Sequence, residues 1–452
     1  MKRITIIGGG ASGTLLAVNL AANALEKEIE INLVENRSRI GRGVAFGTTI
    51  DSHLLNVPAG RMGAFPEKPA HFHEWLIAKG YPYGDHDFVP RVRYGEYLRE
   101  LLSEATGISK PNLRVNLVDD EAIDLSVNDD SAEVMLRSGE VLPSHAVVLA
   151  LGNHKPPHPS VRDLAFTSSE RYFQDPWSSQ LYETIQPDDP IFIVGTGLSM
   201  VDVALHLHRR GHRGKISAIS TRGLLPAVHK LGYSYPPFAT ELNGLDRITD
   251  VLKVVRKHMK LADSTGSNWR AVIDSLRPVT QDIWRDLPIP EKRYFKQHLS
   301  RYWNVARHRM PPEAAEILKE MQSAGTLDIL KGRLKTIELN DGGEFVIGFR
   351  SNGSTNSATA NVLVNCIGSE SDFSKIDSLF VKNLIARDVI RCDELSLGIN
   401  ATPDGRVING SGTPSSIVFT LGTALKGILW ESTAIPEIRV QAQNLARGLL
   451  ND

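Results

Sequence analysis

Three glycines at a fixed spacing near the start of the chain could bind a phosphate group. Gly8, Gly10 and Gly13 form the pattern Gly-x-Gly-x-x-Gly between an apolar, strand-like run and a helical run. Such glycines allow a tight turn, close approach of the backbone to a pyrophosphate and close helix packing, with the helix N-terminus facing the anion. Glu35 ends the next predicted strand (30–34), where a ribose-binding carboxylate is expected. The sequence therefore predicts a site for an adenine dinucleotide whose ribose hydroxyls are free.

Other candidate contacts to this dinucleotide lie in loops and at strand ends. Arg42 stands in a glycine-rich, basic loop after Glu35, and its guanidinium could make charge-assisted bonds to a pyrophosphate. The alternative is an exposed loop with solvated arginines. Asn56 lies in an irregular stretch (53–61) with little surface character and could contact a bound ring. The remaining candidates are Ser12, Val118, Gly152 and Gly422.

A second glycine turn follows an apolar strand in the middle of the chain. It keeps the two glycines nearest the phosphates, whereas Met200 replaces the third. At the end of the next strand, hydroxyls and a guanidinium replace the acid, and these groups would bind a 2′-phosphate that a carboxylate would repel. The candidate residues are Gly195, Gly197, Ser199, Ser220, Thr221 and Arg222. We predict NADP(H) here rather than NAD(H); a surface arginine after a strand is the alternative.

A basic segment, 224–324, is the candidate substrate region. It is predicted to be largely helical, and its densest part (297–312) combines histidine, arginine and aromatic side chains. Such a cluster could bind an anionic substrate or the phosphates of a nicotinamide cofactor. A solvated helix face with core aromatics is the alternative, and the better one for any single residue. The candidates are His298, Arg301, Tyr302, Trp303, Arg307, His308 and Arg309.

The two cysteines restrict the redox chemistry. Cys366 and Cys392 are far apart in sequence and form no Cys-x-x-Cys pair, which excludes a redox-active dithiol and predicts no metal site. We expect each to be a buried, inert thiol rather than a lone reactive one.

The elements that would position these residues occur twice. Each half has a glycine turn, a second strand, an insertion, a small meander and an apolar strand that ends in glycine. A duplication of this length indicates two dinucleotide-binding domains. The predicted fold is α/β, with two Rossmann-like domains that each carry a small β-meander and a helical insertion in the second. The expected boundaries are 1–160 with 369–452, 187–223 with 325–368, and 224–324 for the insertion.

Length and composition are those of an ordinary globular protein. The chain has 452 residues, enough for two or three domains, of which 41% are hydrophobic and 23% charged. The formal net charge of −1 gives no argument for nucleic-acid or membrane binding. No apolar run approaches the roughly 18 residues of a membrane span, and the first apolar run is too short for a signal peptide. We therefore expect a cytoplasmic protein.

Passages over nearly the whole chain resemble flavoproteins with two dinucleotide-binding domains. They are GGGASG, IGRGVAFGT, HLLNVPAGRM, the turn at 195–200, YWNVARHRMPPE and WESTAIPEIRVQA. Among these flavoproteins the chain is similar to the bacterial FAD/NAD(P)-binding proteins, a group similar to flavin-containing and amine N-hydroxylating monooxygenases. The resemblance implies FAD in the first domain, NADPH in the second and a flavin at their junction. A helix predicted from about Leu429 could stabilise negative charge on the reduced flavin with its N-terminus; it either begins or kinks at Pro436.

Two facing nucleotide sites imply hydride flow from NADPH to the flavin. The first expectation is a monooxygenase that transfers oxygen from O2, through a peroxyflavin held in a dry pocket, to a small anionic or amino-bearing metabolite, for example by N-hydroxylation. The second is a flavin reductase or dehydrogenase with a quinone, metal or protein acceptor. The third is a non-catalytic flavoprotein that binds or senses the nucleotide. The expected partners are a small substrate and molecular oxygen, with no nucleic acid.

Overall fold

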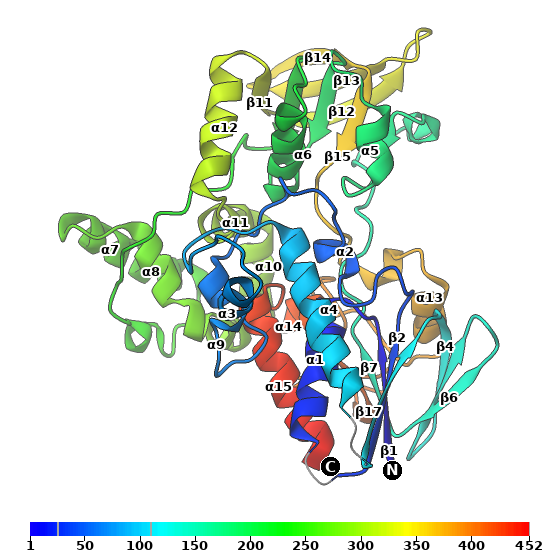
Figure 1. Cartoon of the computed structure of the whole chain (residues 1–452). Helices are drawn as coiled ribbons and strands as arrows, with labels where there is room; N and C mark the ends of the chain where they lie inside the picture. Colours follow the sequence, from blue (N-terminus) through cyan, green and yellow to red (C-terminus); the bar gives the residue numbers. More distant parts are fainter. Residues whose placement is uncertain (25–26, 109–110, 452) are drawn as a thin grey trace.

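Two mainly parallel sheets and a group of helices make up the molecule. The computed structural model describes residues 1–24, 27–108 and 111–451. The first sheet lies at the bottom of Figure 1, the second at the top, and the helical group to the left of both. This α/β architecture with two Rossmann-like units confirms the predicted fold class. In the part of the chain that the structure describes, no helix has the length and apolar character needed to cross a membrane.

The first sheet combines strands from both ends of the chain. Its order is β16-β17-β7-β1-β2-β3, and β1 pairs in parallel with β2 and β7. The strand β17 pairs in parallel with β7, so the chain returns to this sheet after the second one. The bounds are β1 (Lys2–Ile7), β2 (Ile29–Val34), β3 (Leu113–Val118), β7 (Ala146–Leu149), β16 (Arg406–Ile408) and β17 (Pro414–Thr420).

Different layers cover the two faces of this sheet. The helices α1 (Ala11–Asn23), α4 (Arg91–Gly107) and α15 (Ile435–Asn451) pack on one face through a common apolar core (Figure 1). A meander and the helix α13 (Leu379–Ala386) cover the other. The meander consists of β4 (Ala122–Val127), β5 (Ala132–Leu136) and β6 (Val141–Ser144). The carboxyl ends of β1, β2 and β7 point toward the second unit (Figure 1).

The second sheet has the order β11-β10-β9-β15-β8. The helices α6 and α12 pack on one face, and the meander β12-β13-β14 lies against the other. The strand bounds are β8 (Tyr172–Phe173), β9 (Ile191–Val194), β10 (Ile216–Ser220), β11 (Leu327–Lys331), β12 (Arg333–Leu339), β13 (Phe345–Ser351), β14 (Ser354–Ala360) and β15 (Val362–Asn365). The helix bounds are α5 (Ser179–Thr184), α6 (Leu198–Arg209) and α12 (Pro312–Ser323).

Three strands differ from the sequence-based expectation. The stretch 327–330 has the pattern of a short strand before the meander, but as β11 it pairs in parallel with β10 in the main sheet. The strand β14 was not predicted, because its sequence STNSATA is polar and mostly exposed and lacks an apolar alternation. The strand β8 was missed because it is only 2 residues long. The last helix of the basic segment, α12, packs beside α6, so it covers the second sheet.

The other helices of the basic segment form a group that we call the cap. They are α7 (Ile248–Ser264), α8 (Trp269–Ser275), α9 (Thr280–Asp286), α10 (Ile289–Tyr294) and α11 (Ser300–Arg307), with a π-helical turn at Phe295–Leu299. The cap packs against the C-terminal segment of the first unit, where the ring of Trp430 lies 4.9 Å from the rings of both Trp284 and Phe295. The C-terminal helix was expected from about Leu429, but α14 (Lys426–Leu429) ends there and α15 begins at Ile435, with Pro436 in its first turn.

Candidate functional site

The first glycine turn joins β1 to α1 in a conformation that requires glycine. Gly8 has a φ of +105°, and a Cβ there would lie 2.3 Å from the carbonyl oxygen of Ala150. A Cβ on Gly13 would lie 1.9 Å from the carbonyl oxygen of Gly8. Gly10 is the N-cap of α1, and no side chain caps this helix end. The turn therefore leaves free N–H groups at a helix N-terminus, which suits the pyrophosphate of a dinucleotide.

Glu35 lies beside this turn and holds it. Its Oε2 accepts a hydrogen bond from the N–H of Gly9 at 3.1 Å, and its Oε1 accepts one from the N–H of Asn36 at 3.0 Å. A carboxylate has about four lone-pair sites, so Glu35 keeps acceptor capacity for two ribose hydroxyls. The N–H of Glu35 donates to the carbonyl oxygen of Val118 at 3.1 Å. Val118 thus positions the backbone of Glu35.

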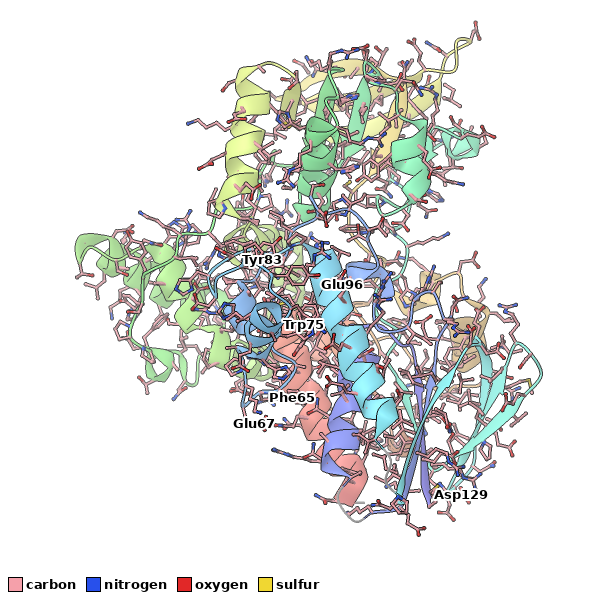
Figure 2. The ribbon with its side chains drawn as sticks, viewed as in Figure 1. Phe65, Glu67, Trp75, Tyr83, Glu96 and Asp129 are labelled. Atoms are coloured by element: carbon pink, nitrogen blue, oxygen red, sulfur yellow. The ribbon has the colours of Figure 1, made fainter. Side chains whose placement is uncertain are left out.

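The basic loop after Glu35 folds back over the glycine turn. The N–H of Gly41 donates to the carbonyl oxygen of Gly9 at 2.8 Å. Arg42 is half-buried; burial and the cation of Arg99 lower its pKa, and the carboxylate of Glu96 opposes this shift. Glu96 lies on α4 near the end that faces the second unit (Figure 2). Since an arginine stays charged in proteins, the loop brings a cation to the turn, as the functional interpretation requires.

A cavity of about 290 Å³ extends from the glycine turn to the start of α15. Of the residues predicted to contact the first dinucleotide, those that line it are Gly8, Gly10, Ser12, Glu35, Arg42, Asn56 and Gly152. Gly13 and Val118 are outside the lining: Gly13 allows the close contact with Gly8, and Val118 positions the backbone of Glu35. Gly422 has a φ of +75° and brings the end of β17 against Ser12, because a Cβ there would lie 2.5 Å from Ser12 Oγ. Most of the predicted set is therefore brought to one cavity.

Sequence reasoning missed several residues of this cavity. They are Phe46, Leu55, Val57, Met62, Arg91, Thr423, Thr433, Ala434, Ile435 and Ile438, among others. Thr433–Ile435 precedes and begins α15, inside the passage WESTAIPEIRVQA that carried part of the resemblance. Arg91 begins α4 and has no local motif to mark it, because its role depends on a contact with a distant element.

Arg91 links the cavity to the second unit. Its Nη2 lies 2.8 Å from Oδ2 of Asp202 on α6, and its guanidinium stacks over the ring of Trp177 at 4.9 Å. Burial raises the pKa of Asp202 to about 6, although Arg91 opposes this shift. Asn56, also in the cavity wall, accepts a hydrogen bond through its carbonyl oxygen from His229 Nε2 at 3.0 Å. The cavity thus lies where the first unit, the second unit and the start of the basic segment meet.

The second glycine turn repeats the geometry of the first. Gly195 has a φ of +109°, and a Cβ there would lie 2.3 Å from the carbonyl oxygen of Cys366. Met200, which replaces the third glycine, is fully buried in the core of this unit. Among the described residues, and apart from its chain neighbours, nothing lies within 4 Å of a Cβ placed on Gly197, so space is open there. The turn therefore keeps the features that bind phosphate, while a methionine fills the helix–sheet contact.

The candidate 2′-phosphate residues lie beyond this turn at the end of β10. Ser220 Oγ accepts hydrogen bonds from Thr196 Oγ1 at 2.9 Å and from the N–H of Gly223 at 3.0 Å, so it stabilises the loop. Thr221 and Arg222 are exposed beside it, and Ser199 is half-buried in the first turn of α6. The preference for NADP(H) remains a prediction that rests on these positions.

The predicted basic cluster contains cations that are already paired. Arg309 is 2% exposed and forms a bidentate pair with Asp274, with N–O distances of 3.0 and 2.8 Å. Arg307 lies 3.6 Å from a carboxylate oxygen of Glu431 and 3.4 Å from one of Glu437. Arg309 is thus held against α8, whereas Arg307 links the cap to the C-terminal segment. Their charges are neutralised within the chain, which favours a structural role.

The other members of the cluster point to different surroundings. Trp303 Nε1 donates to Glu431 Oε1 at 2.7 Å. His298 is exposed and its ring lies 4.6 Å from that of Tyr294, while Arg301 bonds to the carbonyl oxygen of Gln297. Burial lowers the pKa of His308, which keeps its ring neutral. The structure therefore does not bring these seven residues into one anion pocket, because Arg307 and Arg309 are paired with carboxylates on other elements and His298 and Tyr302 are exposed.

Both cysteines are free thiols in separate places. Cys366 is buried at the end of β15 against Gly195, and burial raises the pKa of its thiol. Cys392 is half-buried near Asp372, and burial raises the pKa of its thiol as well. Cys366 is thus buried, as expected.

Comparisons with known proteins agree with this geometry. Residues 5–154 match a protein family described as FAD-NAD(P)-binding. An uncharacterised protein of Escherichia coli, YdhS, is 22% identical over 219 residues, which cover 45% of this chain and 39% of that relative. The matched region thus spans well under half of the curated relative. The family match confirms that the first glycine turn belongs to a domain of the FAD- and NAD(P)-binding kind.

Solved structures share the fold over almost the whole chain. An ornithine N-hydroxylase from Kutzneria sp. 744, solved with reduced FAD, NADP+ and L-ornithine, is 13% identical and has a TM-score of 0.65, covering 99% of this chain and 98% of that one. The FAD-bound cadaverine monooxygenase of Erwinia amylovora is 16% identical with a TM-score of 0.65, covering 100% and 94%. At these identities the likeness establishes the fold, and it confirms the predicted resemblance to two-domain flavoproteins of this type.

Proposed function

We propose that this protein is an NADPH-dependent flavoprotein monooxygenase that binds FAD in the first unit. For an amine substrate the balanced reaction is R–NH2 + O2 + NADPH + H+ → R–NHOH + NADP+ + H2O. The observation that carries this proposal is the cavity that runs from the first glycine turn to the start of α15, in whose wall Arg91 is paired with Asp202 of the second unit. A flavin bound there would lie next to the unit in which NADPH would bind.

The residues of the cavity fit FAD. The glycine turn and the N-terminus of α1 would bind the pyrophosphate, with Arg42 supplying a positive charge, and Glu35 would bind ribose hydroxyls. The far end of the cavity is apolar, and its lining there includes Val57, Met62, Ile435 and Ile438. These side chains would hold the ring system and keep water from it.

The bound flavin would supply hydride acceptance from NADPH and activation of oxygen. The protein's part is to position and shield it. The N-terminus of α15 begins at the cavity wall with Ile435, so its helix dipole would stabilise negative charge nearby. No general acid or base from the chain is needed for this role.

The cysteines disfavour a disulfide reductase. Cys366 is buried behind the second glycine turn, and Cys392 lies beside Asp372 rather than in the cavity lining. Electrons from a reduced flavin would then have to pass to an acceptor from outside the chain. Oxygen with a substrate is the acceptor that the fold neighbours favour; a quinone, metal or protein is the second candidate.

A labelled-oxygen experiment separates these candidates. The purified protein, loaded with FAD, is reduced by NADPH without oxygen and then mixed with 18O2 and one of L-ornithine, cadaverine or decylamine. We expect rapid bleaching of the flavin and, with an accepted amine, a product that contains one 18O atom. Hydrogen peroxide in amounts equal to NADPH with every amine, together with steady anaerobic turnover with a quinone, would contradict the monooxygenase and favour the reductase.

A further inference from the structure

A second cavity, of about 460 Å³, lies inside the cap. Its walls come from α7, α8, α9, the π-helical turn, α11 and Trp430, and almost all lining side chains are aliphatic or aromatic. This volume lies within the range of small-molecule sites, which are roughly 300–1,000 Å³ and mostly apolar. The side chains that line an unfilled apolar cavity lose packing contacts, so a bound molecule would stabilise the cap.

The polar atoms in these walls are directed away from the cavity. Trp284 Nε1 donates to the carbonyl oxygen of Gly427 at 2.9 Å, and Trp303 Nε1 donates to Glu431 at 2.7 Å. Thr280 Oγ1 donates to the carbonyl oxygen of Leu276 at 2.8 Å. The interior therefore offers an occupant apolar surface, and a charged group placed there would lose its hydration without compensation.

One charged residue, Arg256, stands in the lining, at the exposed side of α7. Tyr302, which is 48% exposed, is a second exposed residue of the lining. Two neighbouring cations of α7 are paired: Lys253 with Asp250 at 2.7 Å and Lys257 with Glu241 at 2.8 Å. Within the described residues, no carboxylate lies in ion-pair distance of Arg256. Its guanidinium is thus available to an anionic group at the mouth.

The cap cavity and the dinucleotide cavity are lined by residues that lie close together in sequence. Trp430 lines the first and Thr433 the second, and only the buried Glu431 and Ser432 lie between them in sequence. Trp430 has a φ of +59°, in the left-handed region that a bulky residue rarely adopts. Such strain persists where the surroundings enforce it and is concentrated at ligand sites. Here the rings of Trp284 and Phe295 hold Trp430 in place.

We infer that the cap cavity binds the apolar body of an elongated small molecule whose anionic end lies at Arg256. A role of this molecule as the oxygenase substrate would rest on the proposed function; the binding itself does not. This occupant differs from the short, charged amines named for the solved neighbours. The anionic end is placed at Arg256 rather than in the histidine–arginine cluster, because Arg307 and Arg309 of that cluster are already paired with carboxylates of this chain.

Binding of decanoate to the FAD-loaded protein tests the inference without turnover. Decanoate carries the required body and head group but no oxidisable nitrogen or sulfur. We expect saturable binding by calorimetry, with a change in tryptophan fluorescence because Trp284, Trp303 and Trp430 line the cavity. Decylamine, with the same chain and the opposite charge, should bind more weakly, and L-ornithine should not bind in the cavity.

Two matched variants on α7 locate the site. Leu252→Trp would fill part of the cavity and should weaken decanoate binding about tenfold, the effect of excluding roughly two methylene groups. Leu261→Trp adds the same ring at a position that is 48% exposed and outside the lining, so it should bind like the wild type. Arg256→Gln should remove the preference for decanoate over decylamine.

The outcomes decide between the claims. Absence of saturable decanoate binding, or equal binding by Leu252→Trp and Leu261→Trp, would overturn the cavity as the site. Equal affinity of the wild type for decanoate and decylamine would overturn the role of Arg256. Because these measurements need neither NADPH nor oxygen, they stand apart from any failure of the proposed oxygenase reaction.

Discussion

Arg91, in the wall of the dinucleotide cavity, forms a buried ion pair with Asp202 on α6 of the second unit, at an N–O distance of 2.8 Å. The two side chains are 13% and 8% exposed. Loss of one partner from such a pair leaves the other charge buried and unpaired, which is costly. This contact therefore couples the place where FAD would bind to the unit where NADPH would bind.

Asp202→Asn should weaken that coupling. The amide keeps the shape and one acceptor but removes the charge that balances Arg91. We expect FAD to remain bound, while the anaerobic rate of flavin reduction by NADPH falls about tenfold, equivalent to about 1.4 kcal/mol. Stopped-flow absorbance measures this rate. Asp188→Asn, in an exposed pair with Arg213 of the same unit, is the control and should leave the rate unchanged.

Glu35→Ala should weaken FAD binding by a factor of about 10 to 100, since a charge-assisted hydrogen bond contributes roughly 1.5–3 kcal/mol. Glu35→Gln keeps an acceptor for the N–H of Gly9 and should show a smaller loss. Titration of apoprotein with FAD, followed by flavin fluorescence, measures both. Asp129→Asn changes an exposed acid in a meander loop far from the cavity (Figure 2) and serves as the control. Unchanged FAD affinity in Glu35→Ala would place the ribose elsewhere.

Arg222→Ala tests the preference for NADP(H). If the exposed guanidinium binds the 2′-phosphate, its removal should raise KM for NADPH about tenfold and leave KM for NADH unchanged. Steady-state oxidation of the two nucleotides gives both values. Arg162→Ala removes another exposed arginine and should affect neither. A parallel rise in both KM values would mean that Arg222 supports the fold rather than the phosphate.

Arg309→Ala should lower stability by about 2–3 kcal/mol, because the carbonyl oxygens of Ala306 and Arg270 would lose their buried donor and the half-exposed carboxylate of Asp274 would lose its partner. Urea unfolding of the variant compared with wild type measures the loss. Arg301→Ala, taken from the same predicted cluster but from a half-buried helix position, should cost less than about 1 kcal/mol. Equal stability of Arg309→Ala and wild type would reopen a binding role for this residue.

The glycine turns and their strands could be predicted from the sequence because each has a local signature. A run of apolar residues, a fixed glycine spacing and an acid after the next strand are all visible in a short window, and Gly8, Glu35 and Gly195 hold the expected positions. The sequence analysis assigned 369–452 to the first domain, and β17 of this segment pairs with β7 in the first sheet.

The contacts between elements could not be predicted, because they join residues that are distant in the chain. Nothing in the sequence pairs Arg307 with Glu437 or Arg91 with Asp202. A dense group of cations therefore indicated an anion site, whereas their carboxylate partners lie on other elements. The apolar cavity of the cap could not be predicted for the same reason, because its lining residues have the sequence pattern of the ordinary core faces of amphipathic helices.

Because His229, which contacts the cavity wall, is buried, we expect the free energy of unfolding to fall in acid. Burial lowers the pKa of His229 to about 4, from an ordinary value of 6.5, so folding favours its neutral ring. The contribution of this shift to the free energy of unfolding is fully present above pH 6.5. It is lost as the pH falls toward 4, by about 3 kcal/mol in all. His229→Gln keeps a donor for the carbonyl oxygen of Asn56 but does not titrate. Urea unfolding at pH 7 and pH 4 should therefore show a smaller loss for this variant than for wild type, and equal losses would contradict the assigned shift.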